Sequence, residues 1–411
     1  MFIIKVPNKL KEIIVDLPPS KSISNRLLML NALSLSPKTI NNLADCDDTI
    51  VMKNVLTSCG NDFNIGAAGT AMRFLTAYFS IKNGEWHLTG DQRMQQRPIK
   101  SLVETINKIG GQIEYSENKG FPPLHIFGKE LKGGNVEIDG NISSQYISAL
   151  LMIAPLMTNG IKINLKGKII STPYIKMTLS LMKQFGIDAK WKDDTIVVPS
   201  GEYIPVSTTV ESDWSAVSYW FEIVALSKEV PHIYLKGLEN ISIQGDSVVR
   251  TLFNQFGVES EFTEKGLLLY KGGNITNYFQ YDFTYNPDLV PTIAVTCAFL
   301  DIPFFLTGLQ SLLIKETNRI LALSNELRKF GFDIQTNNKN NLFWNGGKIE
   351  KQPNICLNSY NDHRMIMSFA PALVKTEPYK VENPTVVTKS YPNFWEDLKQ
   401  IGITNTISPA T

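Results

Sequence analysis

The chain has 411 residues, of which 43% are hydrophobic and 19% charged, and its formal net charge is +1. This length exceeds what one hydrophobic core usually serves, which predicts two domains or a repeated fold, and the apolar content excludes a disordered chain. The near-neutral balance excludes a global positive field that would attract nucleic acid or an anionic membrane, so any anion must be bound by local groups.

The cysteines and histidines are too scattered for a disulfide framework or a metal motif. The four cysteines form no CxxC pair and the four histidines have no spacing typical of metal ligands, so no metal site is predicted. The N-terminal apolar run is too short for a signal peptide. Pro291, Asp301 and Pro303 interrupt the apolar segment 289–309, which is therefore expected to be core and not a membrane span. We expect a cytoplasmic protein.

Amphipathic stretches, each followed by a glycine and a short apolar strand, recur six times. The glycines stand at positions 60, 111, 186, 257, 331 and 402. Glycine suits the end of a helix because it enters the left-handed region without steric cost. The pattern predicts an α/β fold with three such units in each of two domains, and a domain boundary near 210–215.

The first motif in chain order is PPSKSISNR, which leads into the apolar stretch LLMLNAL. Serines at a helix start can cap it, and the first turn would present Lys21, Ser22 and Arg26 together with free backbone N–H groups. Ser22 and Arg26 are four residues apart, so both can face one phosphate or carboxylate. The alternative is a capped surface helix with two incidental cations.

Three further helix starts in the first half carry polar groups. The run of small residues 66–71 in GAAGTAMR would let an anion approach the backbone near Gly69, although close helix packing is the preferred explanation of this motif taken alone. Pro98 predicts a helix start that fixes Arg97 at its entrance. Hydroxyls and amides precede two more helices, at Ser143, Ser144 and Gln145 and at Ser171 and Tyr174, where they could also serve only as caps.

The second half adds acids and cations at helix starts. Asp288 precedes an apolar helix as either an N-cap or a general base. Lys315, Glu316 and Arg319 are expected to open the helix that continues to residue 331, unless they form an ordinary solvated face. Arg364 opens another helix, and Lys389 lies near the C-terminal end. Only eight of the 40 basic residues are arginines, which suggests that some of them are placed for bidentate binding.

Together these motifs identify a family. The strings PPSKSISNR, GAAGTAMR, DQRMQQRP, ISSQYISALLM, STPYIKMTL, KETNRILALSNELRKFG, YNDHRM and TKSYPNFW occur in this order over nearly the whole chain. They resemble the 5-enolpyruvylshikimate-3-phosphate (EPSP) synthases, the enolpyruvyl transferases of the shikimate pathway to chorismate and the aromatic amino acids. UDP-N-acetylglucosamine enolpyruvyl transferases share the fold but have asparagine where this chain has Ser22.

The resemblance implies a two-domain enolpyruvyl transferase fold, an inside-out α/β barrel of six βαβαββ units. Residues 15–212 would form the domain that binds mainly shikimate 3-phosphate. Residues 1–14 and 213–411 would form the other domain and complete the phosphoenolpyruvate site, with hinges near 13–16 and 210–215. The protein is expected to act as a monomer without a cofactor.

The resemblance also implies the ligand contacts. Shikimate 3-phosphate would contact Lys21, Ser22, Arg26, Ser143, Ser144, Gln145, Ser171, Tyr174, Asp288, Ser311 and Lys315. Phosphoenolpyruvate would contact Lys21, Gly69, Arg97, Gln145, Arg319, Arg364 and Lys389. Asp288 and Glu316 are the candidate acid–base groups, together with Lys21 or Lys389. A phosphate-binding scaffold that retains the fold without turnover remains the non-enzymatic alternative.

Three positions depart from the family pattern. Ala67 replaces an asparagine common in the glycine-rich loop, Phe74 replaces a proline after Arg73, and Ser311 replaces an asparagine before Lys315. The family's response to the inhibitor glyphosate is therefore not carried over to this chain. None of the three changes removes a charged group from the implied site.

Overall fold

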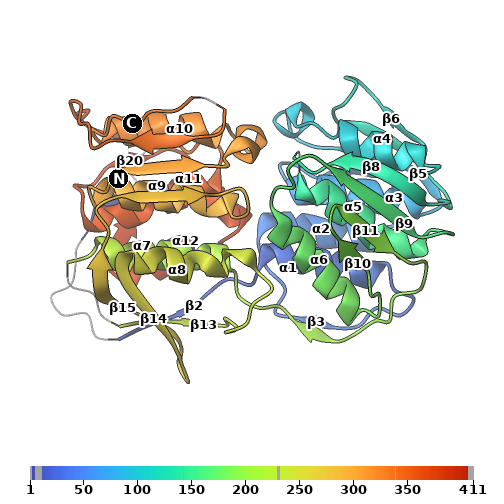
Figure 1. Cartoon of the computed structure of the whole chain (residues 1–411), viewed down its shortest axis with the longest axis horizontal. Coiled ribbons are helices and arrows are strands. Elements are labelled where there is room, and N and C mark those ends of the chain that lie inside the picture. The colour runs from blue at the N-terminus through green and yellow to red at the C-terminus, as the bar shows by residue number, and fades with distance from the viewer. Residues whose placement is uncertain (1, 5–11, 142, 229–231, 338, 406–411) are drawn as a thin grey trace. The chain divides into compact units, whose positions relative to one another are not determined.

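The structure is a computed structural model that describes residues 2–4, 12–141, 143–228, 232–337 and 339–405. The chain divides into two compact units, one formed by residues 20–210 and the other by residues 1–19 together with 211–411. We call them the central-segment unit and the terminal-segment unit. Each unit contains both helices and strands and is α/β (Figure 1).

The central-segment unit contains two four-stranded sheets and a short two-stranded one, with strand orders β4-β5-β7-β6, β10-β11-β9-β8 and β12-β3. Its strands are β3 (Ile40–Asn41), β4 (Asp62–Asn64), β5 (Gly84–Thr89), β6 (Ile113–Tyr115), β7 (Leu124–Gly128), β8 (Gly134–Asp139), β9 (Ile161–Lys166), β10 (Lys190–Lys192), β11 (Thr195–Val198) and β12 (Thr208–Thr209). Its α-helices are α1 (Lys21–Ala32), α2 (Asp47–Thr57), α3 (Gly69–Ile81), α4 (Lys100–Lys108), α5 (Ser144–Ile153) and α6 (Thr172–Gln184).

The helices of this unit pack on one another as well as on the sheets. Almost every residue of α3 and α5 is buried, which fits their nearly continuous apolar sequence. In contact with them, α1 and α6 complete an internal helical layer. The strands alternate buried and exposed residues, as in β8 and β9, so each sheet presents one face to this layer and one face outward.

The terminal-segment unit contains a four-stranded sheet, β14-β15-β13-β2, and three smaller sheets, β16-β17-β18, β19-β20 and β1-β21. Its strands are β1 (Phe2–Ile4), β2 (Ile13–Asp16), β13 (Ile233–Lys236), β14 (Phe256–Thr263), β15 (Gly266–Ile275), β16 (Phe279–Asp282), β17 (Phe304–Thr307), β18 (Leu342–Trp344), β19 (Cys356–Leu357), β20 (Lys380–Val381) and β21 (Ile403–Asn405). Its α-helices are α7 (Trp214–Leu226), α8 (Val249–Asn254), α9 (Val290–Phe299), α10 (Arg319–Lys329), α11 (His363–Phe369) and α12 (Phe394–Lys399).

Helices α7, α9 and α11 form the centre of the terminal-segment unit, and each of their residues is buried. Helices α7 and α8 pack against the long hairpin β14–β15, as Figure 1 shows. The apolar segment around α9 is thus core, as expected. Among the described residues, no helix combines the length and apolar character needed to cross a membrane.

The two segments that connect the units lie side by side within the terminal-segment unit. The N–H of Asp213 donates to the carbonyl of Pro18 at 2.9 Å, and Pro19 forms a β-bridge with Ser212. The units separate between residues 19 and 20 and between 210 and 211, which differs from the expected division after residues 14 and 212. Residues 13–16, expected at a hinge, form strand β2, which pairs in parallel with β13.

Most helix–glycine–strand junctions have the predicted conformation. Gly186 after α6 and Gly331 after α10 have φ values of +85° and +93°, where a side chain would be strained. Two positions differ. At Gly60, α2 ends at Thr57 and the chain continues through the extended Ser58. After α4, the left-handed residue is Gly110, with φ +103°, and not Gly111 as predicted. The interval from Gly60 to Gly111 is the shortest of the five between the repeated glycines, and it begins at the different ending of α2.

Candidate active site

The first predicted anion site lies at the start of α1. The Ser20 side chain caps this helix by accepting from the N–H of Ile23, so the first turn begins with the half-buried Lys21 and Ser22. The Lys21 ammonium lies 3.3 Å from the carboxylate of Asp48 at the start of α2. An incoming phosphate would compete with Asp48 for this cation.

Arg26 is buried and connects three helices. Its Nε donates to the Thr178 hydroxyl at 2.7 Å, Nη1 to the Ser22 carbonyl at 2.9 Å, and Nη2 to the Ser148 hydroxyl at 3.2 Å and the Tyr174 carbonyl at 3.4 Å. Of its five N–H groups, one on Nη1 has no hydrogen bond among the described residues. Burial lowers its pKa to about 10, a value at which it remains a cation at neutral pH.

Thr178 and Ser148 were not predicted from the sequence. The Thr178 hydroxyl lies 2.8 Å from the Ser148 hydroxyl and 2.9 Å from the Tyr174 carbonyl, and its one proton can be donated to either; the contact with Ser148 ties α6 to α5 beneath Arg26. Both residues lie four positions after a predicted site residue, Ser144 or Tyr174, and so on the same helix face. That spacing is the signal that could have found them.

The serine motifs lie at the starts of α5 and α6 as expected. Ser143 caps α5 by accepting from the N–H of Gln145 at 3.3 Å, and Ser144 is its first residue. Ser171 precedes α6 in the left-handed conformation, with φ +53°, which is uncommon for a residue other than glycine. Arg26 on α1 contacts Ser148 on α5 and Tyr174 on α6. These contacts bring the starts of the three helices, with Ser22, Ser144 and Tyr174, into one region.

The glycine-rich loop and Arg97 also come together. A methyl group built on Gly69, the first residue of α3, would lie only 2.5 Å from Nη1 of Arg97. The Gln145 amide donates to the Thr70 hydroxyl at 3.1 Å, so the start of α5 meets the start of α3. Gly69, Arg97 and Gln145, predicted from separate motifs, thus lie in one part of the central-segment unit.

Arg73 and Tyr146, which were not predicted as site residues, support this arrangement through hydrogen bonds to backbone carbonyls. Buried Arg73 donates to the carbonyls of Gly69 at 2.9 Å and Pro98 at 3.3 Å, and the Tyr146 hydroxyl donates to the same Pro98 carbonyl. The carbonyl of Pro98 is therefore occupied by side chains. Helix α4 begins at Lys100 and not at Pro98 as expected.

In the terminal-segment unit, the carboxylate of Asp288 is surrounded by cations. Oδ1 lies 3.0 Å from Nη1 of Arg319 and 3.4 Å from Nζ of Lys315, and Oδ2 lies 3.1 Å from Nη2 of Arg364. Asp288 is part of a short 3-10 helix, η4 (Pro287–Leu289), and α9 is preceded by Leu289. The N-cap alternative for Asp288 is thus excluded.

Arg319 extends the network to two more carboxylates. It contacts Glu316 at 3.0 Å and binds Asp362 in bidentate fashion, through Nε at 2.7 Å and Nη2 at 3.1 Å. Glu316 also lies 3.5 Å from Nζ of Lys389. Lys315 and Glu316 precede α10, which begins at Arg319 after the cap Asn318, so the expected helix start was four residues too early.

Opposing effects set the protonation of this cluster. Burial alone would raise the pKa of Asp288, but Arg364, Lys315 and Arg319 together hold it well below its usual value. Burial lowers the pKa of Lys315, and Asp288 only partly offsets this effect. The resting state therefore contains an ionised Asp288, and Lys315 is easier to deprotonate than an exposed lysine.

Further carboxylates support the cluster. Asp362 caps α11 by accepting from the N–H of Arg364 at 3.0 Å, which links the helix start to the position of that arginine. Asp246 accepts from the Ser215 hydroxyl at 2.5 Å, and burial raises its pKa to about 6. Asp362 lies in the motif YNDHRM, but no role was predicted for it. None of the sequence motifs contains Asp246.

Within each unit, the predicted residues form coherent groups. Ser311 lies in the 3-10 helix η5 (Gln310–Ile314) that ends beside Lys315. Among the described residues of the terminal-segment unit, the network contains the four cations Lys315, Arg319, Arg364 and Lys389 and the three carboxylates Asp288, Glu316 and Asp362. Such an array can bind an anion and offers a carboxylate for proton transfer.

Comparison with known proteins identifies the family. The family model for EPSP synthase (3-phosphoshikimate 1-carboxyvinyltransferase) matches residues 4–64 and 54–398. A 3-phosphoshikimate 1-carboxyvinyltransferase of Bacteroides fragilis is 48% identical over 402 residues, covering 98% of each chain. The one of Aliivibrio salmonicida is 34% identical and covers 95% of this chain and 96% of its own.

Solved structures show the same fold at lower identity. An EPSP synthase of Acinetobacter baumannii superposes with a TM-score of 0.77 at 21% identity, covering 98% of both chains. The enolpyruvyl transferase NikO of Streptomyces tendae superposes with a TM-score of 0.71 at 13% identity, covering 98% of this chain and 97% of its own. The fold is thus the two-domain α/β fold of enolpyruvyl transferases, and the chain belongs to the EPSP synthase family.

Proposed function

We propose that the protein transfers the enolpyruvyl group of phosphoenolpyruvate to the 5-hydroxyl of shikimate 3-phosphate, giving 5-enolpyruvylshikimate 3-phosphate and inorganic phosphate. This is the shikimate-pathway step that leads toward chorismate and the aromatic amino acids. The observation that carries the proposal is the network around Asp288, in which cations hold an ionised carboxylate at 3.0–3.4 Å. The family to which the chain belongs supports it independently.

The network is suited to phosphoenolpyruvate because the ligand is itself a carboxylate and a phosphate. In the resting protein, Arg319, Arg364 and Lys389 are paired with Asp288, Asp362 or Glu316. We assign these three cations to phosphoenolpyruvate, which would compete with the internal carboxylates for them. Arginine forks are preferred for such bidentate contacts. In the central-segment unit we assign Lys21, Gly69, Arg97 and Gln145 to the same ligand.

Asp288 is the proposed base for the 5-hydroxyl. Its pKa is held low by Arg364, Lys315 and Arg319, so as a resting carboxylate it is a weak base. When an anionic substrate takes over part of their charge, the pKa of Asp288 rises, since fewer positive charges stabilise the ionised form. Binding of the anionic substrate would thus make Asp288 a stronger base for the reaction of that substrate. We assign Lys315, whose Nζ lies 3.4 Å from Oδ1 of Asp288, and Ser311 to the ring hydroxyls of shikimate 3-phosphate.

The reaction is an addition followed by an elimination. The 5-oxygen attacks C2 of phosphoenolpyruvate and loses its proton to Asp288, while C3 gains a proton, and the tetrahedral intermediate then expels phosphate and loses a proton from C3. We assign the proton transfers at C3 to Glu316, together with Lys21 or Lys389; Lys389 contacts Glu316 at 3.5 Å. The addition and the elimination involve no net oxidation or reduction, so the reaction requires no redox cofactor.

Shikimate 3-phosphate would be held mainly by the central-segment unit. We assign its phosphate to Ser143, Ser144 and Ser171 at the starts of α5 and α6, where helix N-termini favour an anion. Its ring would contact Lys21, Ser22, Arg26, Gln145 and Tyr174. Arg26 has most of its N–H groups engaged, so its main contribution is to hold the three helix starts in register. We propose a cytoplasmic, monomeric enzyme.

Release of phosphate from phosphoenolpyruvate tests the function directly. The protein should release one phosphate per acceptor consumed with shikimate 3-phosphate and none above background with UDP-N-acetylglucosamine or without an acceptor. Release with the amino sugar alone would assign the chain to the other enolpyruvyl transferase activity. Absence of release with either acceptor, in protein that still binds shikimate 3-phosphate, would favour the non-catalytic scaffold.

A further inference from the structure

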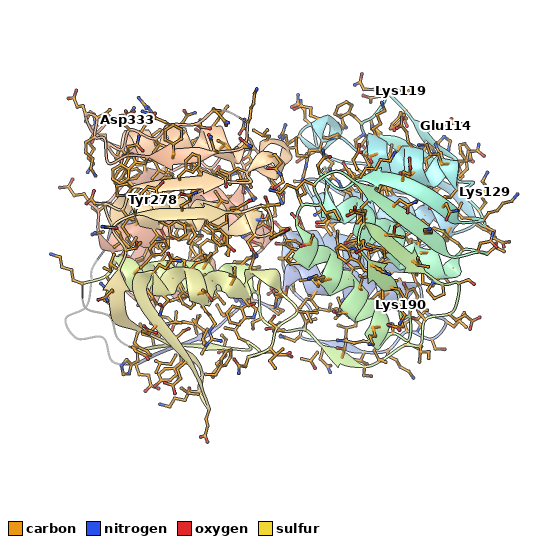
Figure 2. The ribbon with its side chains drawn as sticks, in the orientation of Figure 1. Glu114, Lys119, Lys129, Lys190, Tyr278 and Asp333 are labelled. Carbon is orange, nitrogen blue, oxygen red and sulfur yellow. The ribbon has the colours of Figure 1, made fainter. Side chains whose placement is uncertain are left out.

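A cluster of histidines and acids lies on the outward face of the sheet β4-β5-β7-β6, apart from the proposed active site. Strand pairing places His87 of β5 opposite His125 of β7, with Asp62 of β4 and Glu114 of β6 as the next partners on either side. Paired residues share one face of a sheet. Figure 2 shows Glu114 at the outer side of the unit, among side chains that point away from it.

Three of these neighbouring side chains converge. The Glu85 carboxylate lies two residues before His87 on the same face, and its Oε1 is 2.6 Å from Nε2 of His125. The His87 and His125 rings stack with their centroids 4.1 Å apart. One ligating atom from each of Glu85, His87 and His125 lies within 4.8 Å of the other two.

The His125 ring is held in a fixed orientation. His87 covers one side of it, and Phe127 lies 4.3 Å from it, centroid to centroid. The His125 side chain is 23% exposed and that of Glu85 is 57% exposed, so an ion from solvent can reach the edge where Nε2 points. A ring oriented by packing loses little entropy when it binds a metal.

The chemistry of the three donors selects the class of ion. Two imidazoles and one carboxylate form the ligand set of borderline transition metals, whereas Mg²⁺ and Ca²⁺ prefer oxygen ligands alone. Zn–N distances of about 2.1 Å place tetrahedral ligand atoms about 3.4 Å apart. Glu85 and His87 are exposed, so rotations of these two side chains can bring their ligand atoms to that spacing around Nε2 of the packed His125 ring. A water would supply the fourth ligand.

We propose that Glu85, His87 and His125 form a binding site for a divalent transition-metal ion of the zinc class. The ion replaces the proton shared between Glu85 and His125 and cross-links β5 to β7. Glu114 and Asp62 flank the histidines on the same face and add negative charge near the ion. The sequence has no metal motif because strand pairing, and not spacing along the chain, brings positions 87 and 125 together.

Calorimetric titration of the full chain with Zn²⁺ tests the proposal. We expect one ion per chain for the wild type, and affinity at least tenfold weaker in His87→Ala and in His125→Ala. His232→Ala, which removes an exposed histidine of the other unit, is the matched control and should bind as the wild type. Equal affinity in all four proteins, or equally strong binding of Mg²⁺, would overturn the proposal.

A second measurement uses the wild type alone and does not depend on how the variants fold. Long-range ¹H–¹⁵N spectra of the imidazoles should show one ring nitrogen of His87 and one of His125 shifting on addition of Zn²⁺, with His232 unchanged. Shifts confined to other histidines, or none at one equivalent of bound Zn²⁺, would refute the site. Because none of the three ligands belongs to the proposed active site, this result is independent of the enzymatic assay.

Discussion

Replacement of Asp288 by asparagine separates the binding role of the cation network from its catalytic role. The substitution keeps the shape of the side chain but removes its charge and its ability to accept a proton. In the described network it leaves the four cations with two carboxylates in place of three, so attraction for an anion should not decrease. Loss of a general base typically costs about 10² to 10⁴ in rate.

We therefore expect kcat of Asp288→Asn to fall by at least ~10² while KM for phosphoenolpyruvate stays within about tenfold of the wild type. Asp288→Ala should give the same pattern. Steady-state phosphate release with shikimate 3-phosphate measures both constants. Asp333→Asn is the control, since Asp333 pairs with Arg328 at the surface and is labelled in Figure 2. Turnover of Asp288→Asn within about threefold of the wild type would refute the reasoning.

Three further predictions follow from the geometry. Gly69→Ala would place a methyl group 2.5 Å from Nη1 of Arg97, so KM for phosphoenolpyruvate should rise at least ~10-fold and that for shikimate 3-phosphate much less; equal changes in both would contradict the assignment. Thr178→Val removes the hydroxyl beneath Arg26 and should lower the free energy of unfolding, measured in urea titrations, by about 1–3 kcal/mol. Thr178→Ser should restore most of this stability. An unchanged free energy of unfolding in the valine variant would count against the network. Burial raises the pKa of Glu222 on α7 well above its ordinary value, an effect that Thr296 only partly offsets. The folded protein thus keeps a proton that the unfolded chain loses above about pH 4.5, so this stabilisation is complete below that pH and is lost as pH rises toward the folded pKa, by up to about 1.4 kcal/mol per pH unit. Glu222→Gln should flatten the fall in stability as pH rises above about 4.5, and an unchanged slope would show that Glu222 is ionised in the folded state.

The positions at helix starts of the residues assigned to the proposed ligands could be predicted because their motifs are local. Ser22, Ser143, Ser171 and Arg364 all lie at or near helix starts, and a helix start is encoded by a few neighbouring residues. The same logic misplaced two boundaries. Asn318 caps α10 by accepting from the N–H of Leu321 at 3.3 Å, which fixes the helix start at Arg319. Asparagine is a preferred N-cap residue, so Asn318 is the sequence signal that marks this boundary.

The second boundary could not be predicted from nearby residues. A helix that began at Pro98 would need its carbonyl for the N–H of Leu102, but Tyr146 and Arg73 occupy that carbonyl. These partners are far apart in the sequence and meet only in the folded unit. Asp246 was missed for the same reason, because its partner Ser215 is 31 residues away, whereas Ser148 and Thr178 carried a local signal in their spacing from Ser144 and Tyr174.

The cluster of Glu85, His87 and His125 shows most clearly which features could not be predicted from the sequence. Its ligands come from two strands whose register depends on the whole sheet, so the spacing between residues 87 and 125 has no meaning by itself. The buried Asp362 was quoted in a motif, but its bidentate contact with Arg319 depends on how α10 and α11 pack. Local chemistry could be predicted from the sequence, whereas the pairing of charges could not.

The central chemical claim is that the carbon–oxygen bond of phosphoenolpyruvate breaks after addition of the 5-hydroxyl. Phosphoenolpyruvate labelled with ¹⁸O in the bridge between C2 and phosphorus tests it in one turnover experiment with shikimate 3-phosphate. The account predicts that mass spectrometry finds the label in inorganic phosphate and none in the enolpyruvyl product. Label retained in the organic product, with unlabelled phosphate, would mean cleavage at phosphorus and would contradict it.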